Sequence, residues 1–374
     1  MKAEKVKAEL LNFLSKEYIK PKVVAMPDFF FDRIVNLDYD LAGFSAKLNE
    51  IASQKGGSLD CISQMDFKGG NAINTACSLA ILGAKVTPIV CTNNLGIKKI
   101  ESILKKYDQD LSHIKRVDKA SITTSLELSS KNQKVNIMLR DLGGLENFQA
   151  SDLSERDNDL IESADYVCLF NWAGTRKYGT ELAQKVFSKV KKRGRGKTYY
   201  DTADPNSNAK KIPELVNKVL STELIDILSL NENEAISYAS TIDDQIRKKK
   251  KTKINDELSL DAARVLANKL NMRVDLHAHS LSATITKKKE ICVRTFSIKP
   301  LRATGAGDAW NAGNILGDMN LLSDESRLIF ANAVSACYLS DISGRYPTKK
   351  MLFKYIEKKA IDELLFANKH TPIF

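Results

Sequence analysis

Short apolar runs alternate with longer amphipathic segments along most of the chain. The runs predict strands, and the segments, whose apolar residues recur every three or four positions, predict helices. The predicted strands are 23–26, 85–91, 165–170, 198–201, 225–230 and 272–276, and the predicted helices are 71–82, 179–192, 258–270, 307–316 and 325–340. Strands that alternate with crossover helices indicate an α/β fold with a doubly wound, mostly parallel sheet flanked by helices. Ligands of such folds bind beyond the carboxyl ends of the strands.

Two stretches depart from this alternation and predict a small additional β layer. Residues 31–38 and 120–139 have a β pattern without a crossover helix. The second stretch contains the turn Ser130-Lys131-Asn132-Gln133 between alternating segments, which is typical of a hairpin. We therefore expect residues 31–62 and 118–142 to form a small lid over the active site.

The N-terminal segment and one lysine-rich segment lie outside this scheme. Residues 1–20 place apolar side chains at helical spacing among Lys and Glu, so we expect an amphipathic helix rather than a signal peptide. Residues 241–257 are polar and lysine-rich, and we expect an insertion loop there. No internal repeat is found, and residues 1–374 are expected to form a single domain.

Composition narrows the class of protein. Apolar residues make up 43% of the chain, and 57 Lys and Arg against 46 Asp and Glu give a net charge of +11. The basic residues are scattered and lack interleaved aromatics, so nucleic acid is an unlikely partner compared with an anionic small substrate. No stretch approaches the ~20 apolar residues of a membrane span. The six cysteines form no CxxC pair, which favours a reducing cytoplasm and argues against a cysteine zinc site.

A glycine-rich turn near the C-terminal end carries the first candidate chemistry. Thr304-Gly305-Ala306-Gly307-Asp308 follows an extended segment, 295–298, and opens a predicted helix. Glycines and a helix N-terminus make a cradle for the charge on a transferring phosphoryl group. A carboxylate beside it can accept the proton of an attacking hydroxyl. The alternative is a tight turn with Asp308 as an ordinary helix-start residue.

A second candidate segment lies near the N-terminal end. Gly69 and Gly70 precede a predicted helix, and Asn74 lies about one turn into it, where its amide can bind hydroxyls. Asp28 and Asp32 follow the first strand and could chelate vicinal hydroxyls. The alternatives are a simple turn for the glycines and a helix cap for Asp28.

These segments together resemble the PfkB, or ribokinase-like, family of carbohydrate and nucleoside kinases over residues 22–345. The resemblance rests on Gly69-Gly70-x-x-x-Asn74 and Gly305-Ala-Gly-Asp308, in this order and more than 200 residues apart. Three other elements agree with the family pattern: Asp201-Thr-Ala-Asp204-Pro205 after a central strand, Asn231-x-x-Glu234, and Asn332 in the penultimate helix.

The resemblance implies roles for the matched residues. Asp308 would be the catalytic base and the backbone amides of Gly305, Ala306 and Gly307 the anion hole. The acceptor would be bound by Asp28, Asp32, Gly69, Gly70 and Asn74. Arg140 and Asp141 would face the site from the end of a lid strand, with Arg140 suited to a phosphate on the acceptor. The alternative for Arg140 is an ordinary surface residue of the lid. On the donor side, the implied residues are Asn231, Glu234, Thr304 and Asn332, with Glu234 holding Mg²⁺ through water. The lid of the family often mediates dimerisation, which implies a homodimer.

The chain departs from the family pattern on the donor side. Arg302 occupies a position that is usually Asp and helps to place a monovalent cation, so potassium activation is in doubt. We expect the positive charge of Arg302 near the nucleotide phosphates; the alternative is a salt bridge elsewhere. His277-Ala-His279-Ser replaces a glycine-containing turn, and either histidine could hydrogen-bond donor phosphates. Without a third ligand nearby, the two histidines do not indicate zinc. A similar H-x-H element occurs in ADP-dependent sugar kinases, so ADP stays open as the donor, but the chain length and the Ala303-Thr-Gly-Ala-Gly-Asp308 motif resemble the ATP-using group more closely and favour ATP.

The expected function is therefore phosphoryl transfer from a nucleotide, with Mg²⁺, to a hydroxyl of a sugar, sugar phosphate or nucleoside. Two alternatives stay open: an ADP-dependent sugar kinase, and a non-catalytic ligand-binding or regulatory protein on the same fold. The sequence does not select among the acceptors.

Overall fold

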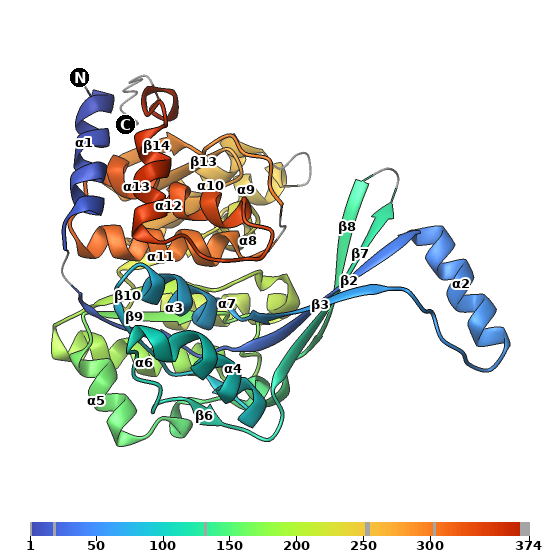
Figure 1. Ribbon diagram of the computed structural model, residues 1–374. Helices are drawn as coiled ribbons and strands as arrows, with labels where there is room; N and C mark the ends of the chain where they lie inside the picture. Colours follow the sequence, from blue (N-terminus) through green and yellow to red (C-terminus); the bar gives the residue numbers. More distant parts are fainter. Residues whose placement is uncertain (1, 18–19, 131–132, 251–254, 302–303, 367–374) are drawn as a thin grey trace.

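The computed structural model describes residues 2–17, 20–130, 133–250, 255–301 and 304–366 (Figure 1). Its centre is an eight-stranded sheet of order β14-β13-β12-β11-β10-β9-β1-β4. The strands are β1 Lys22–Met26, β4 Lys85–Pro88, β9 Tyr166–Phe170, β10 Lys197–Asp201, β11 Ile227–Leu230, β12 Arg273–His277, β13 Leu281–Ile285 and β14 Glu290–Arg294. From β12 to β4 all pairs are parallel, whereas β13 and β14 are antiparallel. The structure thus confirms the predicted fold class and adds an antiparallel edge that the sequence analysis did not predict.

Helices cover both faces of this sheet, because both faces of its central strands are apolar. In β1, Val23 and Ala25 pack on one side, whereas Val24 and Met26 pack on the other. The first side carries α1 Lys2–Ser15, α3 Asn71–Ile81, α4 Asn94–Leu104, α11 Ala306–Met319, α12 Asp324–Leu339 and α13 Lys349–Glu357. The second carries α5 Glu155–Ser163, α6 Gly179–Arg193, α7 Ile212–Leu215, α8 Glu232–Ile242, α9 Asp244–Lys249 and α10 Asp256–Leu270. None of the described helices is both long and apolar enough to cross a membrane.

A second, four-stranded sheet projects from the body (Figure 1). Its order is β3-β2-β7-β8, from β2 Phe30–Asp40, β3 Ser63–Gly69, β7 Ser121–Ser130 and β8 Gln133–Asp141. The predicted hairpin is present, with Ser130 opposite Gln133. The helix α2, Leu41–Ser53, lies at the outer end of this sheet and has no buried residue. We call this sheet with α2 the lid.

The remaining elements are short. Strands β5 Cys91–Thr92 and β6 Lys115–Arg116 form a separate pair, so the predicted strand 85–91 is divided. The 3₁₀ helices are Lys105–Tyr107, Gly143–Asn147, Ala150–Asp152, Pro205–Lys211 and Asp362–Leu364, and a π turn spans Val216–Leu220.

The stretch 241–257, expected as a loop, instead contains α9 and the start of α10; residues 251–254 lie outside the described part. Asp243 caps α9, and Ile246 is buried against the body, which explains the helix.

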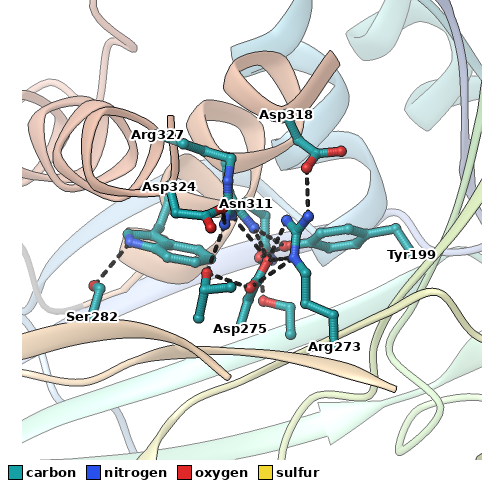
Figure 2. Close-up of polar contacts among 12 residues, drawn as sticks. Tyr199, Arg273, Asp275, Ser282, Asn311, Asp318, Asp324 and Arg327 are labelled. Atoms are coloured by element: carbon teal, nitrogen blue, oxygen red, sulfur yellow. Dashed lines mark hydrogen bonds and ion pairs between the residues drawn. The ribbon is translucent and has the colours of Figure 1, made fainter. Parts of the chain in front are cut away.

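A buried polar network fixes α11 and α12 to the sheet (Figure 2). Asp275 of β12 accepts hydrogen bonds from Arg273 (2.7 Å), Asn314 (2.8 Å) and Arg327 (3.2 Å). Burial opposes the ionisation of Asp275, but the charges of Arg273 and Arg327 outweigh it and hold its pKa well below the usual range. Arg327 is 1% exposed and also binds Asp324.

The network reaches the carboxyl end of β10 through α11. Asn311 donates to Asp201 (2.6 Å) and accepts from Tyr199 (2.6 Å) and Ser229 (2.7 Å). These bonds hold the first turns of α11, which carry the glycine-rich turn, in a fixed position over the sheet.

Candidate active site

A cavity of about 230 Å³ lies between the lid and the carboxyl ends of the sheet strands. Its lid wall comprises Phe30, Asp32, Ile34, Phe67, Lys68, Thr123, Ser125, Met138 and Arg140. Its body wall comprises Gly70, Asn71, Asn74, Asn171, Ala203, Thr304, Gly305, Asp308 and Tyr338. The two glycine-rich segments, far apart in sequence, therefore meet at the sheet edge where an α/β fold binds its ligand.

The turn before α11 requires glycine at its N-cap. Gly305 has φ 85°, and a Cβ there would lie 2.5 Å from the Tyr338 hydroxyl. Ala306, Gly307 and Asp308 form the first turn of α11, whose backbone N–H groups have no partner within the helix. Such N–H groups and the helix dipole favour an anion.

The carboxylate of Asp308 is 6% exposed and is held by two amides of α3. Asn71 Nδ2 donates to Oδ1 (2.8 Å), and Asn74 Nδ2 donates to Oδ2 (2.9 Å). Burial raises the pKa of Asp308, the hydrogen bonds from Asn74 and Asn71 lower it, and the charges of Asp201 and Asp28 raise it; the resulting pKa is about 8. A carboxyl with such a pKa can exchange a proton near neutral pH.

Asn71 is a site residue that the sequence analysis missed. It directly follows the two glycines and is the first residue of α3, so its side chain points across the helix end toward Asp308. The sequence feature that could have identified Asn71 is its position at a helix N-terminus beside two glycines, where polar side chains commonly bind a ligand or cap the helix.

Asn74 occupies the site differently from the expectation. Its Oδ1 accepts from Lys68 Nζ (2.7 Å), so both ends of the amide are bound, and the NH₂ faces Asp308. Lys68 also donates to the Tyr346 hydroxyl (3.3 Å), whose ring stacks on Tyr338. In this structure, Asn74 orients the carboxylate of Asp308.

Asp32 and Gly69 fit together across neighbouring lid strands. A Cβ on Gly69 would lie 1.9 Å from Asp32 Oδ2, so only glycine leaves room for this carboxylate. Burial raises the pKa of Asp32 to about 6, against a hydrogen bond with Thr123 and the charges of Arg140 and Lys68. Gly70 has φ 101°, and a Cβ there would lie 2.9 Å from the Asp28 carbonyl oxygen.

Asp28 lies beneath the cavity, and the structure does not support its expected contact with the acceptor. It is 0% exposed, and it accepts hydrogen bonds from the backbone N–H groups of Asn71 (2.9 Å) and Ala72 (2.8 Å) and from Asn171 Nδ2 (2.8 Å). Asp28 thus satisfies the N-terminus of α3, which is the helix-cap alternative of the sequence analysis.

Asp141 also departs from the expectation. Arg140 faces the cavity, and because successive side chains of a strand alternate between faces, Asp141 points away from it. There it pairs with Lys119 (2.6 Å) and accepts from the Gly143 N–H (3.0 Å).

The donor-side residues are mostly engaged with one another. Asn231 and Glu234 form a capping box at the start of α8, with Asn231 N–H and Nδ2 donating to the two carboxylate oxygens (2.9 and 2.8 Å). Asn332, 3% exposed, accepts from Ser282 (2.7 Å) and Trp310 (2.9 Å), so its amide lies in a buried network rather than on an open base pocket.

The two histidines, His277 and His279, have different surroundings. The His277 ring packs on Trp310 at 5.0 Å and touches the glycine-rich turn, since a Cβ on Gly307 would lie 3.3 Å from its Cε1. Burial lowers the pKa of His277 to about 4. Its Nε2 has no hydrogen-bond partner among the described residues. His279 is exposed, and Arg302 lies outside the described residues.

Comparison with known proteins identifies the family. The protein-family model described as "pfkB family carbohydrate kinase" matches residues 34–351 of the chain. The chain belongs to the PfkB family. It is a carbohydrate or nucleoside kinase of this family, and PfkB kinases are phosphotransferases.

The relatives agree with this assignment. The PfkB chain is 24% identical to ribokinase from Haemophilus influenzae over 77% of this chain and 87% of that protein. Among solved structures, it is similar to Arabidopsis thaliana ribokinase complexed with ribose and ATP (TM-score 0.69, 18% identity, 91% of this chain and 100% of that chain). It is also similar to adenosine kinase from Sinorhizobium meliloti (TM-score 0.68, 15% identity, 91% and 100%). At these identities, the solved structures show the fold alone.

Proposed function

We propose that this PfkB kinase transfers the terminal phosphoryl group of ATP to a hydroxyl of a sugar-type acceptor, with Asp308 as the base. The observation that carries the proposal is the position of the Asp308 carboxylate. It lines the acceptor cavity in the first turn of α11, next to the backbone amides of the glycine-rich turn, and two amide side chains hold it in place.

Each group around the cavity has a separate role in the proposed reaction. The acceptor hydroxyl gives its proton to Asp308 while its oxygen attacks the terminal phosphorus in line, and the bond from phosphorus to the leaving nucleotide oxygen breaks. The N–H groups of Gly305, Ala306 and Gly307 stabilise the charge on the transferring group. Asp32 binds acceptor hydroxyls, and the lid limits the access of water as a competing acceptor.

We propose that Mg²⁺ accompanies the nucleotide and is bound through water near Glu234. Among the described residues, no group of three His, Cys, Asp or Glu is placed to hold a metal directly. Burial raises the pKa of Glu234 well above its usual range, and the negative charge of Asp201 raises it further. A cation nearby would offset the repulsion between the two carboxylates. This fits a magnesium ion that keeps most of its waters and binds mainly the substrate phosphates. When bound, Mg²⁺ neutralises charge on those phosphates.

The proposal is tested by a panel of sugars, sugar phosphates, sugar acids and nucleosides against ATP, GTP and ADP, with donor consumption as the readout. The variant Asp308→Asn should keep ligand binding and lose turnover by at least about 10²-fold, since the amide cannot accept the proton. Asp244→Asn, at a 72% exposed side chain, is the matched control. Near-normal turnover of Asp308→Asn would exclude Asp308 as the base. ADP as the preferred donor would replace ATP in the proposal.

We also propose that the lid mediates a homodimer. Its exposed apolar side chains support this: Leu41, Leu48, Met65, Ile122, Ile137, Met138 and Leu139 are each 41–56% exposed. Light scattering of the purified protein measures the mass directly, and a monomer at micromolar concentration would contradict this part of the proposal.

A further inference from the structure

The cavity wall of the lid is organised in rows that run across its four strands. Asp32 lies opposite Phe67 on one side and Thr123 on the other, and Thr123 lies opposite Arg140. All four side chains line the cavity, so they form a single row on one face of the sheet. We call it the polar row.

The neighbouring row is apolar except for one serine. It consists of Met65, Ile34, Ser125 and Met138, and three of these line the cavity. The polar row therefore places a hydroxyl-binding carboxylate, Asp32, and a cation, Arg140, two strands apart. With adjacent strands ~4.8 Å apart, their Cα atoms are separated by roughly 10 Å. One acceptor can reach both side chains.

The surroundings of Arg140 suit a residue that binds a ligand rather than one that forms an internal ion pair. Its guanidinium lies 5.4 Å from the centre of the Phe30 ring, so its plane is supported by an aromatic face. Among the residues that the structure describes, no carboxylate forms an ion pair with it. An unpaired, supported guanidinium on a cavity wall suits bidentate binding of a carboxylate or phosphate.

Charges of both signs act on Arg140. Burial lowers the pKa of Arg140; the charges of Asp28, Asp32 and Asp204 oppose this shift, and that of Arg176 adds to it. Arg176 is exposed and follows β9 in the loop that also gives Asn171 to the cavity wall. None of these carboxylates forms an ion pair with Arg140 in the described part of the chain, so the guanidinium donors stay available to an anionic ligand, and the charge of Arg176 favours such a ligand.

We propose that Arg140 binds an anionic group of the acceptor, a phosphate or a carboxylate. The acceptor is then a sugar phosphate or a sugar acid rather than a neutral sugar or nucleoside. This rests on the proposed function, because it concerns the acceptor of the same site. Asp32 holds the hydroxyl part, Arg140 the anionic part, and Asp308 faces the hydroxyl that receives the phosphoryl group.

The kinetic test uses acceptor pairs that differ in charge: fructose with fructose 6-phosphate or fructose 1-phosphate, and glucose with gluconate. At least one anionic member should exceed its neutral partner by tenfold or more in kcat/KM. Arg140→Met, which keeps an apolar side chain and removes the charge, should remove this preference through KM with little change in kcat. Arg140→Lys should restore part of it. The two pairs distinguish phosphate from carboxylate.

Arg33→Met is the matched control, because Arg33 lies on the opposite face of the same lid sheet, where it pairs with Asp66. It should leave the charge preference unchanged. Neutral members that equal their anionic partners in both the fructose and the glucose pairs would overturn the proposal. So would an equal loss in Arg140→Met with neutral and anionic acceptors, since that result indicates a merely structural role.

A binding measurement separates this proposal from the proposed function. Without donor, fructose 6-phosphate or gluconate should raise the thermal unfolding midpoint more than its neutral partner. The difference should vanish in Arg140→Met and persist in Arg33→Met. Arg140-dependent binding without turnover would sink the kinase proposal and leave the anion subsite standing. No Arg140-dependent shift with either anionic class would overturn the subsite, whatever the turnover.

Discussion

The hydrogen bond from Asn71 to Asp308 should set the pH at which the kinase becomes active. A hydrogen bond donated to an ionised carboxylate favours the charged form, so its removal raises the pKa of that carboxyl. Asn71→Ala deletes the donor at 2.8 Å but keeps the backbone N–H that binds Asp28 (2.9 Å), so the start of α3 should be preserved.

The size of the shift follows from the strength of the bond. A hydrogen bond to a charged group contributes about 1.5–3 kcal/mol, and 1.36 kcal/mol corresponds to one pKa unit. The pKa of Asp308, about 8 in the native protein, should therefore rise to about 9 or 10 in the variant. Because the base must be ionised, kcat/KM should fall about tenfold or more at pH 7 and recover toward the native value above the new pKa.

The assay is kcat/KM between pH 6 and 10.5 with the best acceptor and a saturating donor. Asn94→Ala is the matched control, because Asn94 is the first residue of α4, as Asn71 is of α3, but it is exposed and does not line the cavity. Asn71→Asp should shift the profile further than Asn71→Ala, since it places a second carboxylate beside Asp308. A uniform loss at every pH, with the acidic limb unmoved, would refute the reasoning.

Two further predictions concern the acceptor wall and the buried network. Gly69→Ala should raise KM for the acceptor about tenfold or more with a smaller change in kcat, because the new Cβ would lie 1.9 Å from Asp32 Oδ2; an unchanged KM in steady-state kinetics would show that Asp32 does not bind the acceptor. Arg327→Met should lower the free energy of unfolding in urea by about 3–5 kcal/mol, because it leaves the buried charge of Asp275 with one fewer partner. The exposed Arg33→Met is the matched control and should lower the free energy of unfolding far less, and an equally small loss for Arg327→Met would show that Arg273 alone compensates Asp275.

Local patterns in the sequence determined much of this protein. The alternation of apolar runs and amphipathic segments is set by burial on both faces of a parallel sheet, and it predicted the central strands and their helices. The two glycine-rich segments required glycine for local reasons, a positive φ at Gly70 and Gly305 and a close approach at Gly69, and they predicted where the cavity lies. The apolar pattern did not predict α2 or the antiparallel edge of the main sheet. Because α2 buries no residue, its sequence carries no pattern set by burial.

Only the tertiary structure decided how the candidate side chains are used. Asp28 and Asp32 are four residues apart in one segment, yet Asp28 caps α3 and Asp32 faces the cavity. Arg140 and Asp141 are neighbours, and the pleat of β8 sends them to opposite faces. Asn74 and Asn71 reach Asp308 from more than 230 residues away in the chain. These assignments depend on strand register and helix placement, which arise from contacts between distant segments, so no local pattern carries them.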